Sequence, residues 1–320
     1  MGGAIAGLTG ALAILAAAAG ASARDPTPPI PVTPAAPPAP VAPAAAEEPA
    51  VPDPLKLTQD PTQRLTLAVM IDGRGPYNFL VDTGSDRTVI SRELAASLAL
   101  PPGPQVRLRE AVGADEVGTV VIDRLAIGNR VIRHIEAPAL AANDIGAAGM
   151  LGVDALRDLH VVMDFKAMQM SSSASRPEAP DSRTIVVHGK SRFGQLILTH
   201  SKIRGVSIVV VVDSGAEVSV GNPALLRLLT QHSLSKDPPA TTEIISVTGR
   251  KLTIEQDQIA EADVGGVVIR NMPLAFAALP IFDHLGLADT PALFLGMDVL
   301  SQCERVSVDL RRREATFTLR

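Results

Sequence analysis

The chain has little of what several common classes of protein depend on. It has one cysteine, Cys303, which excludes an intramolecular disulfide framework and a cysteine-based zinc site. Its six histidines include no pair four positions apart, so we expect no metal site and no cofactor. Tryptophan is absent, tyrosine occurs once and aromatic residues make up 2% of the chain. The core must therefore be built from Val, Leu and Ile, which favours small β-rich domains.

Charge of one sign is also not concentrated anywhere. The chain carries 29 basic and 34 acidic residues, for a net charge of -5, and it has no basic block. A nucleic-acid partner is therefore not expected.

The beginning of the chain does not have the pattern of a folded domain. Residues 4–21 are an apolar run followed by Ala21-Ser22-Ala23, which predicts a signal peptide over residues 1–23 and export to the periplasm or beyond. The alternative is an uncleaved anchor that tethers the protein to the inner membrane. Twelve of the 26 prolines lie between residues 24 and 55, so residues 24–61 are predicted to be a disordered, extended spacer.

The rest of the chain repeats itself. Residues 62–170 and 184–320 share a strand–turn–strand unit, an Asp-Thr/Ser-Gly turn, a short helix, a glycine-containing hairpin and a Leu-Gly element before a last helix and strand. Five features in the same order indicate an internal duplication. Residues 171–183 hold no apolar residue larger than alanine and are predicted to be a linker.

Two acidic turns follow directly on runs of large apolar residues. Asp82-Thr83-Gly84-Ser85 comes after Phe79-Leu80-Val81, and Asp213-Ser214-Gly215-Ala216 comes after residues 208–212, which read IVVVV. Such runs are typical of strands buried on both faces, so each Asp is expected where a buried strand ends. A carboxylate there is costly unless it is paired or hydrogen-bonded. If the halves pack with pseudo-two-fold symmetry, Asp82 and Asp213 face each other.

Two adjacent carboxylates share one proton, and this arrangement can hydrolyse a peptide bond. The ionised member takes a proton from a water, while the protonated member donates a hydrogen bond to the scissile carbonyl. The chemistry needs neither a metal nor a covalent intermediate. The expected substrate is a peptide or a protein.

Both halves resemble the retropepsin-like aspartic protease family, in a bacterial exported form with two tandem domains. The resemblance rests on the two acidic turns, each followed later by Leu151-Gly152 or Leu295-Gly296 before a helix. It implies an all-β fold of two acid-protease barrels with few short helices, packed as a pseudo-dimer. It also implies roles for the candidate residues. Asp82 and Asp213 would form a catalytic pair, and the hydroxyls of Thr83 and Ser214 would bond to the opposite half. Gly84, Ser85, Gly215 and Ala216 would support the turns, and flaps would lie near Gly113 and Gly249.

Some alternatives remain open at this point. The fold could be a catalytically silent peptide-binding module, or each half could form its own homodimeric site. Within the dyad, Ser85 can donate a hydrogen bond to Asp82, whereas Ala216 cannot do so for Asp213. We therefore predict that Asp82 is mainly ionised and that Asp213 carries the proton.

Other residues of these motifs have structural interpretations. Asp154 and Asp298 follow the Leu-Gly elements and are predicted to be helix N-caps. Tyr77 is expected to contribute packing, and Cys303 is expected to be a small buried residue in the last helix.

Overall fold

A computed structural model of the chain describes residues 64–110, 113–156, 159–175, 183–192, 195–230, 240–245 and 251–320, together with the short strands β1 (Ile14–Ala16) and β2 (Leu55–Gln59). Strand β1 pairs with strand β6 (Pro102–Glu110). The remaining residues predicted as a signal peptide lie outside the described residues. Within the described ranges, no helix is long and apolar enough to cross a membrane.

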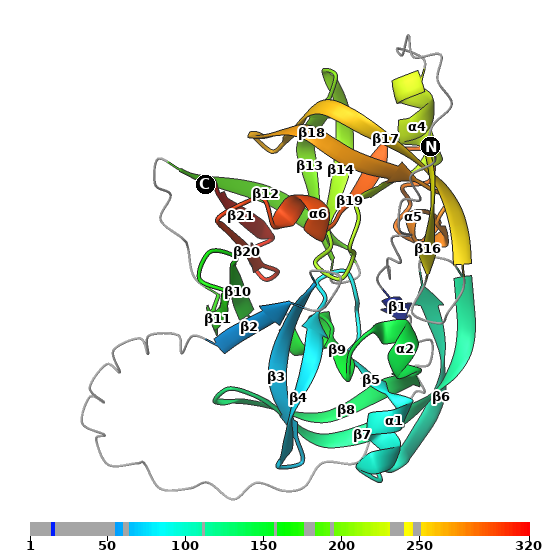
Figure 1. The fold of residues 1–320 in the computed structure, drawn as a ribbon, viewed down its shortest axis with the longest axis vertical. Helices are drawn as coiled ribbons and strands as arrows, with labels where there is room; N and C mark the ends of the chain where they lie inside the picture. The colour runs from blue at the N-terminus through cyan, green and yellow to red at the C-terminus, as the bar shows by residue number, and fades with distance from the viewer. Residues whose placement is uncertain are drawn as a thin grey trace, which may run out of the picture.

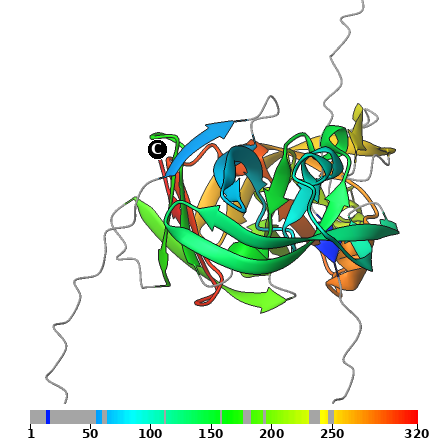
Figure 2. The same ribbon diagram turned by 90° about the horizontal axis from the view of Figure 1, so that it is seen from below.

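The first half of the chain forms a closed ring of six strands. Each strand pairs with the next, and the last pairs with the first. In order around the ring these are β3 (Leu65–Ile71), β4 (Arg74–Val81), β9 (Gly149–Leu151), β5 (Val89–Ser91), β8 (Arg130–Leu140) and β7 (Gly113–Ile127). The long strands β7 and β8, drawn in teal and green, curve across the view from below (Figure 2).

The second half closes a ring with the same connectivity. Its strands pair in the corresponding order. They are β13 (Gln195–Ile203), β14 (Val206–Val212), β19 (Ala292–Leu295), β15 (Val220–Gly221), β18 (Val267–Phe276) and β17 (Lys251–Val264). The predicted all-β class with retropepsin-like barrels is confirmed. Figure 1 shows the first half below and the second half above.

A six-stranded antiparallel sheet joins the two halves, at the left of Figure 1. Its two central strands, β10 and β20, come from different halves, and Val162 lies opposite Ser307 at the middle of their pairing. The sheet order is β2, β11 (Gln169–Ala174), β10 (Leu159–Asp164), β20 (Arg305–Asp309), β21 (Glu314–Thr318) and β12 (Thr184–Arg192).

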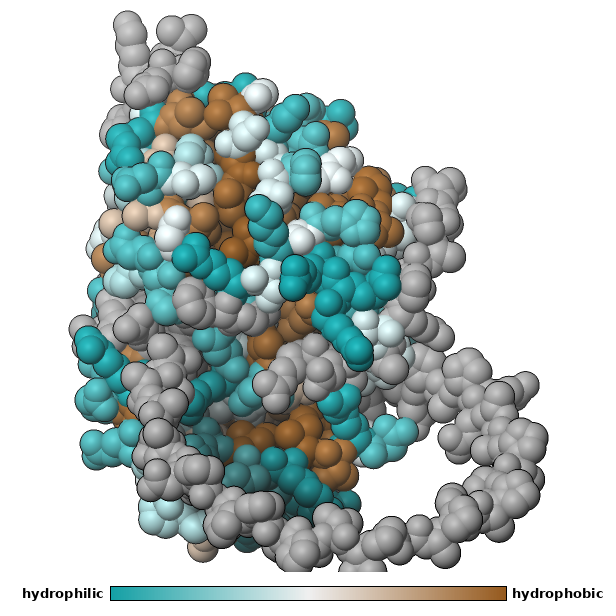
Figure 3. All heavy atoms as spheres, turned by 180° about the vertical axis from the view of Figure 1, so that it is seen from behind, coloured by the Kyte–Doolittle hydropathy of each residue, from teal (hydrophilic) through white to brown (hydrophobic). Residues whose placement is uncertain are grey.

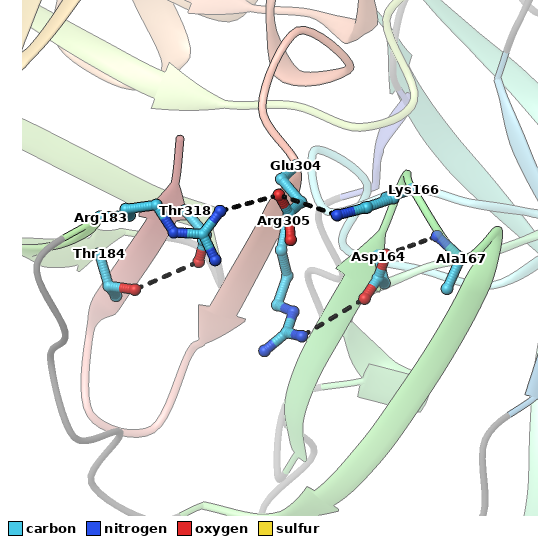
Figure 4. A network of polar contacts seen from close by, with 8 residues as sticks. All are labelled: Asp164, Lys166, Ala167, Arg183, Thr184, Glu304, Arg305 and Thr318. Carbon is cyan, nitrogen blue, oxygen red and sulfur yellow. Dashed lines mark hydrogen bonds and ion pairs between the residues drawn. The ribbon is translucent and has the colours of Figure 1, made fainter. Parts of the chain in front are cut away.

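Charged side chains also connect the halves beside this sheet (Figure 4). Glu304 of the second half binds Lys166 of the first at 3.6 Å, and Arg305 binds Asp164 at 3.4 Å. Glu304 also binds Arg183, at the end of the predicted linker, at 3.1 Å. The basic partners are largely exposed, so each pair contributes at most about 1 kcal/mol. The backbone pairing of β10 with β20 is therefore the stronger link between the halves.

Two of the boundaries predicted from sequence are wrong. Strand β2 lies inside the predicted spacer over residues 24–61, where it pairs with β3 and β11. Strand β11 continues to Ala174, so the predicted linker over 171–183 begins inside a strand. Both strands are recruited by pairing partners that are distant in sequence, which composition alone does not reveal. The division into two domains stays a prediction.

The helices are few and short. Ser91 caps α1 by accepting a hydrogen bond from the Leu94 N–H, and Asn222 accepts one from the Leu225 N–H at the start of α4. The helices are α1 (Arg92–Ser97), α2 (Ala142–Ile145), α3 (Val153–Leu156), α4 (Pro223–Thr230), α5 (Pro280–His284) and α6 (Met297–Leu300). Cys303 is buried as predicted, but it follows α6 rather than lying in it.

Two hairpins lie on the opposite side of the molecule from the joining sheet, at the right of Figure 1. One is formed by β6 with β7, and the other by β16 (Ala240–Ile245) with β17. Gly113 is the first residue of β7 and pairs with Glu110, while Gly249 lies outside the described residues.

The core is aliphatic, as the composition requires. The fully buried large side chains include Phe79, Phe282 and Phe294, and the rest of the core consists mainly of Leu, Val and Ile. Tyr77 packs against this core as predicted. Seen from behind, apolar residues at the surface form patches that polar residues interrupt (Figure 3).

Candidate active site

The two candidate carboxyls lie at the ends of two equivalent strands. Strand β4 ends at Val81, and strand β14 ends at Val212, so Asp82 and Asp213 are the first residues beyond each. The last three residues of both strands are buried, since β4 pairs with β9 and β14 pairs with β19 inside the rings. Both carboxyls are fully buried, with 0% exposure.

The two acidic turns interlock through their hydroxyls. The Thr83 N–H donates to Ser214 Oγ at 3.1 Å, and the Ser214 N–H donates to Thr83 Oγ1 at 3.1 Å. Each hydroxyl then donates to a carbonyl of the other half, Thr83 to Val212 at 3.2 Å and Ser214 to Val81 at 2.9 Å. These four reciprocal hydrogen bonds hold the ends of β4 and β14 together.

The glycines of the turns bring the carboxyls close to the opposite half. A Cβ atom added to Gly84 would lie 2.5 Å from Asp213 Cγ, and one added to Gly215 would lie 2.5 Å from Asp82 Oδ1. No side chain fits at such distances, so glycine is required at both positions. The carboxyl of each half is therefore in contact with the turn of the other.

Backbone N–H groups hold one oxygen of each carboxyl. The Gly84 N–H donates to Asp82 Oδ1 at 2.7 Å. Asp213 Oδ1 accepts two such bonds, from Gly215 at 3.0 Å and from Ala216 at 3.2 Å. In the described part of the chain, neither Oδ2 atom accepts a hydrogen bond from a backbone or hydroxyl donor. The second oxygen of each carboxyl is thus available to a proton, a water or a substrate.

Burial raises the pKa of both carboxyls, and it does so unequally. The pKa of Asp82 is raised well above its usual range by burial, and further by the negative charge of Asp213. Burial also raises the pKa of Asp213, but only to about 6, because Gly215 and Ala216 stabilise its charged form. The two backbone hydrogen bonds at Asp213 Oδ1, against one at Asp82 Oδ1, favour the ionised form at Asp213.

The hydrogen bond on which the predicted protonation of the two carboxyls depended does not form. The hydroxyl of Ser85 donates to the carbonyl of Arg87 at 2.9 Å instead of to Asp82. The carboxyl with the additional donor is Asp213, which uses the backbone N–H of Ala216. Sequence comparison of side chains could not detect a difference that lies in the backbone.

The aspartates that follow the Leu-Gly elements bind the residues just after the acidic turns, which the sequence did not predict. Asp154 Oδ1 accepts hydrogen bonds from the N–H and the hydroxyl of Thr88, at 2.8 and 2.7 Å. Asp298 accepts from the N–H of Ser219 with Oδ2 at 2.9 Å and from its hydroxyl with Oδ1 at 2.7 Å. Both aspartates lie inside short helices, and α6 begins after Gly296, so the predicted N-cap role is wrong.

One contact at the site involves a residue that the motifs did not single out. The Gln195 side chain is completely buried at the start of β13, and its Nε2 donates to the carbonyl of Gly84 at 2.5 Å. The sequence signal that could have identified Gln195 was a polar residue at the start of a buried strand in the second half. Among the described residues, no group of three or more His, Cys, Asp or Glu side chains could hold a metal ion.

Comparison with known families agrees with this geometry in the first half. Residues 67–158 match the family model described as gag-polyprotein putative aspartyl protease. The matched segment contains the Asp82 turn, the first hairpin and Leu151-Gly152. No curated protein matches the chain. Residues 67–158 are thus similar to an aspartyl protease domain of that family.

Proposed function

We propose that the protein is an aspartic endopeptidase with one active site, formed by Asp82 and Asp213 of the same chain. The observation that carries the proposal is the set of reciprocal hydrogen bonds between Thr83 and Ser214, which join the two acidic turns. The aspartyl protease match over residues 67–158 supports the class of reaction. The pairing of β10 with β20 supports a site built within one chain.

In the proposed mechanism the two carboxyls have different tasks. Asp213, the more acidic member, takes a proton from a water as the water oxygen attacks the scissile carbonyl carbon. Asp82 gives its proton to the carbonyl oxygen, which yields a neutral tetrahedral diol. The C–N bond then breaks as the nitrogen takes the proton from Asp213, and a diol hydroxyl returns a proton to Asp82. The products are a carboxylic acid and an amine.

The hairpins β6–β7 and β16–β17 suit the role of flaps over the substrate. They lie on the same side of the molecule, away from the joining sheet (Figure 1). We propose that an extended peptide is enclosed between these hairpins and the dyad, with Gly113 near the end of the first flap. We also propose that the protein is exported, since residues 4–21 are apolar and precede Ala21-Ser22-Ala23.

The test is cleavage of an unbiased peptide pool by the purified protein between pH 3 and pH 8, followed by mass spectrometry. We expect cleavage at mildly acidic pH. The Asp82→Asn variant should lose at least about 1000-fold in kcat, as removal of one member of a catalytic unit usually does. Asp289→Asn, at an exposed loop position, is the matched control and should retain full activity.

Peptide binding without cleavage by the wild-type protein at every pH would contradict the proposal and favour the silent binding module. Equal activity of the Asp82→Asn variant and the wild type would contradict a dyad of Asp82 with Asp213, and would leave a separate homodimeric site of the second half or a contaminant as the source of cleavage.

A further inference from the structure

Gln195 reaches from one half of the molecule into the catalytic turn of the other. It is the first residue of β13, and its side chain is fully buried. Its Nε2 donates to the Gly84 carbonyl, 111 positions away in the chain. Its Oε1 is buried and accepts no hydrogen bond from any residue in the described ranges. A buried unsatisfied oxygen costs stability, so a purely stabilising role does not explain an amide at this position.

Gly84 lies next to both carboxyls of the site. Its N–H donates to Asp82 Oδ1 at 2.7 Å, and its Cα faces Asp213 so closely that an added Cβ would lie 2.5 Å from Asp213 Cγ. Movement of Gly84 would therefore change the position of both carboxyls at once. The hydrogen bond from Gln195 restrains the carbonyl of this same residue.

The first half has a different residue at the corresponding position. Arg64 immediately precedes β3 and lies 18 residues before Asp82, just as Gln195 lies 18 residues before Asp213. Arg64 is also buried; its Nη2 donates to the Ile145 carbonyl at 3.0 Å, and its charge lowers the pKa of Asp82. Gln195 can restrain its target without adding charge, because its amide is neutral.

We propose that Gln195 is a positioning residue of the active site, which acts through the Gly84 carbonyl to hold the two carboxyls in their reactive arrangement. The proposal rests on the proposed function. It also makes the site asymmetric, because the buried cation of Arg64 and the neutral donor of Gln195 both act on the Asp82 turn. Such a restraint matters because a displacement of about 1 Å can lower a rate by about 100-fold.

The first test replaces Gln195 by methionine, which has a similar length and no amide. We expect kcat to fall at least about tenfold with little change in KM, because the substrate still binds while the carboxyls are misplaced. The Gly84 N–H should move away from Asp82, so that Asp82 titrates at a higher pH in carbon-13 NMR of labelled aspartate. Gln302→Met is the matched control, since Gln302 also donates to a backbone carbonyl, that of Asp298 at 2.9 Å, but on the surface.

The second test uses Gln195→Glu, which keeps the shape of the side chain. Its carboxyl can donate to Gly84 only when protonated. We therefore expect near-wild-type kcat at about pH 4.5 and a loss of activity at a lower pH than in the wild type as the pH is raised. Circular dichroism checks that both variants fold. If Gln195→Met does not fold, the pH profile of Gln195→Glu decides the proposal.

The outcomes separate this inference from the proposed function. If the wild type cleaves peptides, and folded variants change neither kcat, the pH profile nor the Asp82 titration, the positioning role is wrong and the enzyme proposal stands. If the wild type cleaves nothing but Gln195→Met shifts the Asp82 titration, Gln195 positions the carboxyls and the enzyme proposal is wrong.

Discussion

Single hydroxyl groups decide whether the two acidic turns stay together. Ser214 Oγ accepts from the Thr83 N–H at 3.1 Å and donates to the Val81 carbonyl at 2.9 Å, and both partners belong to the other half. All of these groups are buried. Loss of the hydroxyl would leave a backbone donor and a backbone acceptor without partners in the interior, which costs about 1–3 kcal/mol for each group.

We therefore predict that Ser214→Ala lowers the free energy of unfolding by about 2–4 kcal/mol and reduces peptidase activity strongly. Ser214→Thr should retain both properties, because the equivalent residue of the other turn, Thr83, makes the same contacts. The control is Ser207→Ala, an exposed position on the same strand β14. Denaturant unfolding and the cleavage assay measure the effects. Equal stability of Ser214→Ala and Ser207→Ala would contradict the interlocking role.

The sequence identifies the two acidic turns because their signal is local. Each Asp-Thr/Ser-Gly turn follows its own apolar strand directly, so Asp82 and Asp213 can be recognised without knowledge of the fold. Gln195 could not be found in this way. Its partner, Gly84, lies 111 positions away, and only the packing of the two halves brings them together.

At the scale of elements, two short helices carry partly buried carboxylates that bind the segments just after the acidic turns. Asp298 of α6 binds both the N–H and the hydroxyl of Ser219, and that hydroxyl also accepts the Gly296 N–H at 3.0 Å. Burial raises the pKa of Asp298 to about 6. The helix is thus joined to the strand that follows the Asp213 turn by three hydrogen bonds around one serine.

Asp298→Ala removes the acceptors of the Ser219 N–H and hydroxyl. We expect the free energy of unfolding to fall by about 2–4 kcal/mol, in line with the loss of a buried hydrogen-bond network. Asp289→Ala, at an exposed position, should change it by less than about 0.5 kcal/mol. Chemical denaturation of both variants gives the comparison. If the two variants unfold at the same denaturant concentration, the carboxylate does not hold α6 in place.

The order of the strands was predictable to a large extent, but their ends were not. Alternation of apolar residues and turn signals such as Asp72-Gly73 identify the strands of each ring. Strand β2 lies within a proline-rich segment and β11 within a serine-rich one, so neither has a strong local preference for β-structure. They form strands because β3 and β10 offer free edges to pair with.

At the scale of the whole molecule, the protein holds several carboxyls whose pKa values are raised by full or partial burial. Burial raises the pKa of Asp86 to about 7 and those of Asp213 and Asp298 to about 6, and it also raises those of Asp82 and Asp154. In the unfolded chain these groups titrate near pH 4. Between about pH 7 and pH 4 the folded state therefore binds more protons than the unfolded state, and acidification stabilises it.

We predict that the melting temperature rises by about 5 °C or more when the pH is lowered from 8 to 5, and falls again below about pH 4 as the other carboxylates become protonated. Asp298→Asn removes one of the titrating groups, so its melting temperature should depend less steeply on pH. Differential scanning calorimetry in buffers of equal ionic strength measures both. A melting temperature that decreases steadily from pH 8 to pH 5 would refute this assignment.

The central claim is that the two halves of a single chain form one dyad. Its most direct test is a mixing experiment with Asp82→Asn and Asp213→Asn. Each variant is first assayed alone. The two variants are then unfolded, refolded separately and combined, and the mixture is assayed. The account predicts that each variant is inactive and that the mixture stays inactive, since every site contains one asparagine. Substantial activity of either variant alone would contradict it and indicate separate homodimeric sites, and recovery of activity on mixing would show that the dyad forms between chains.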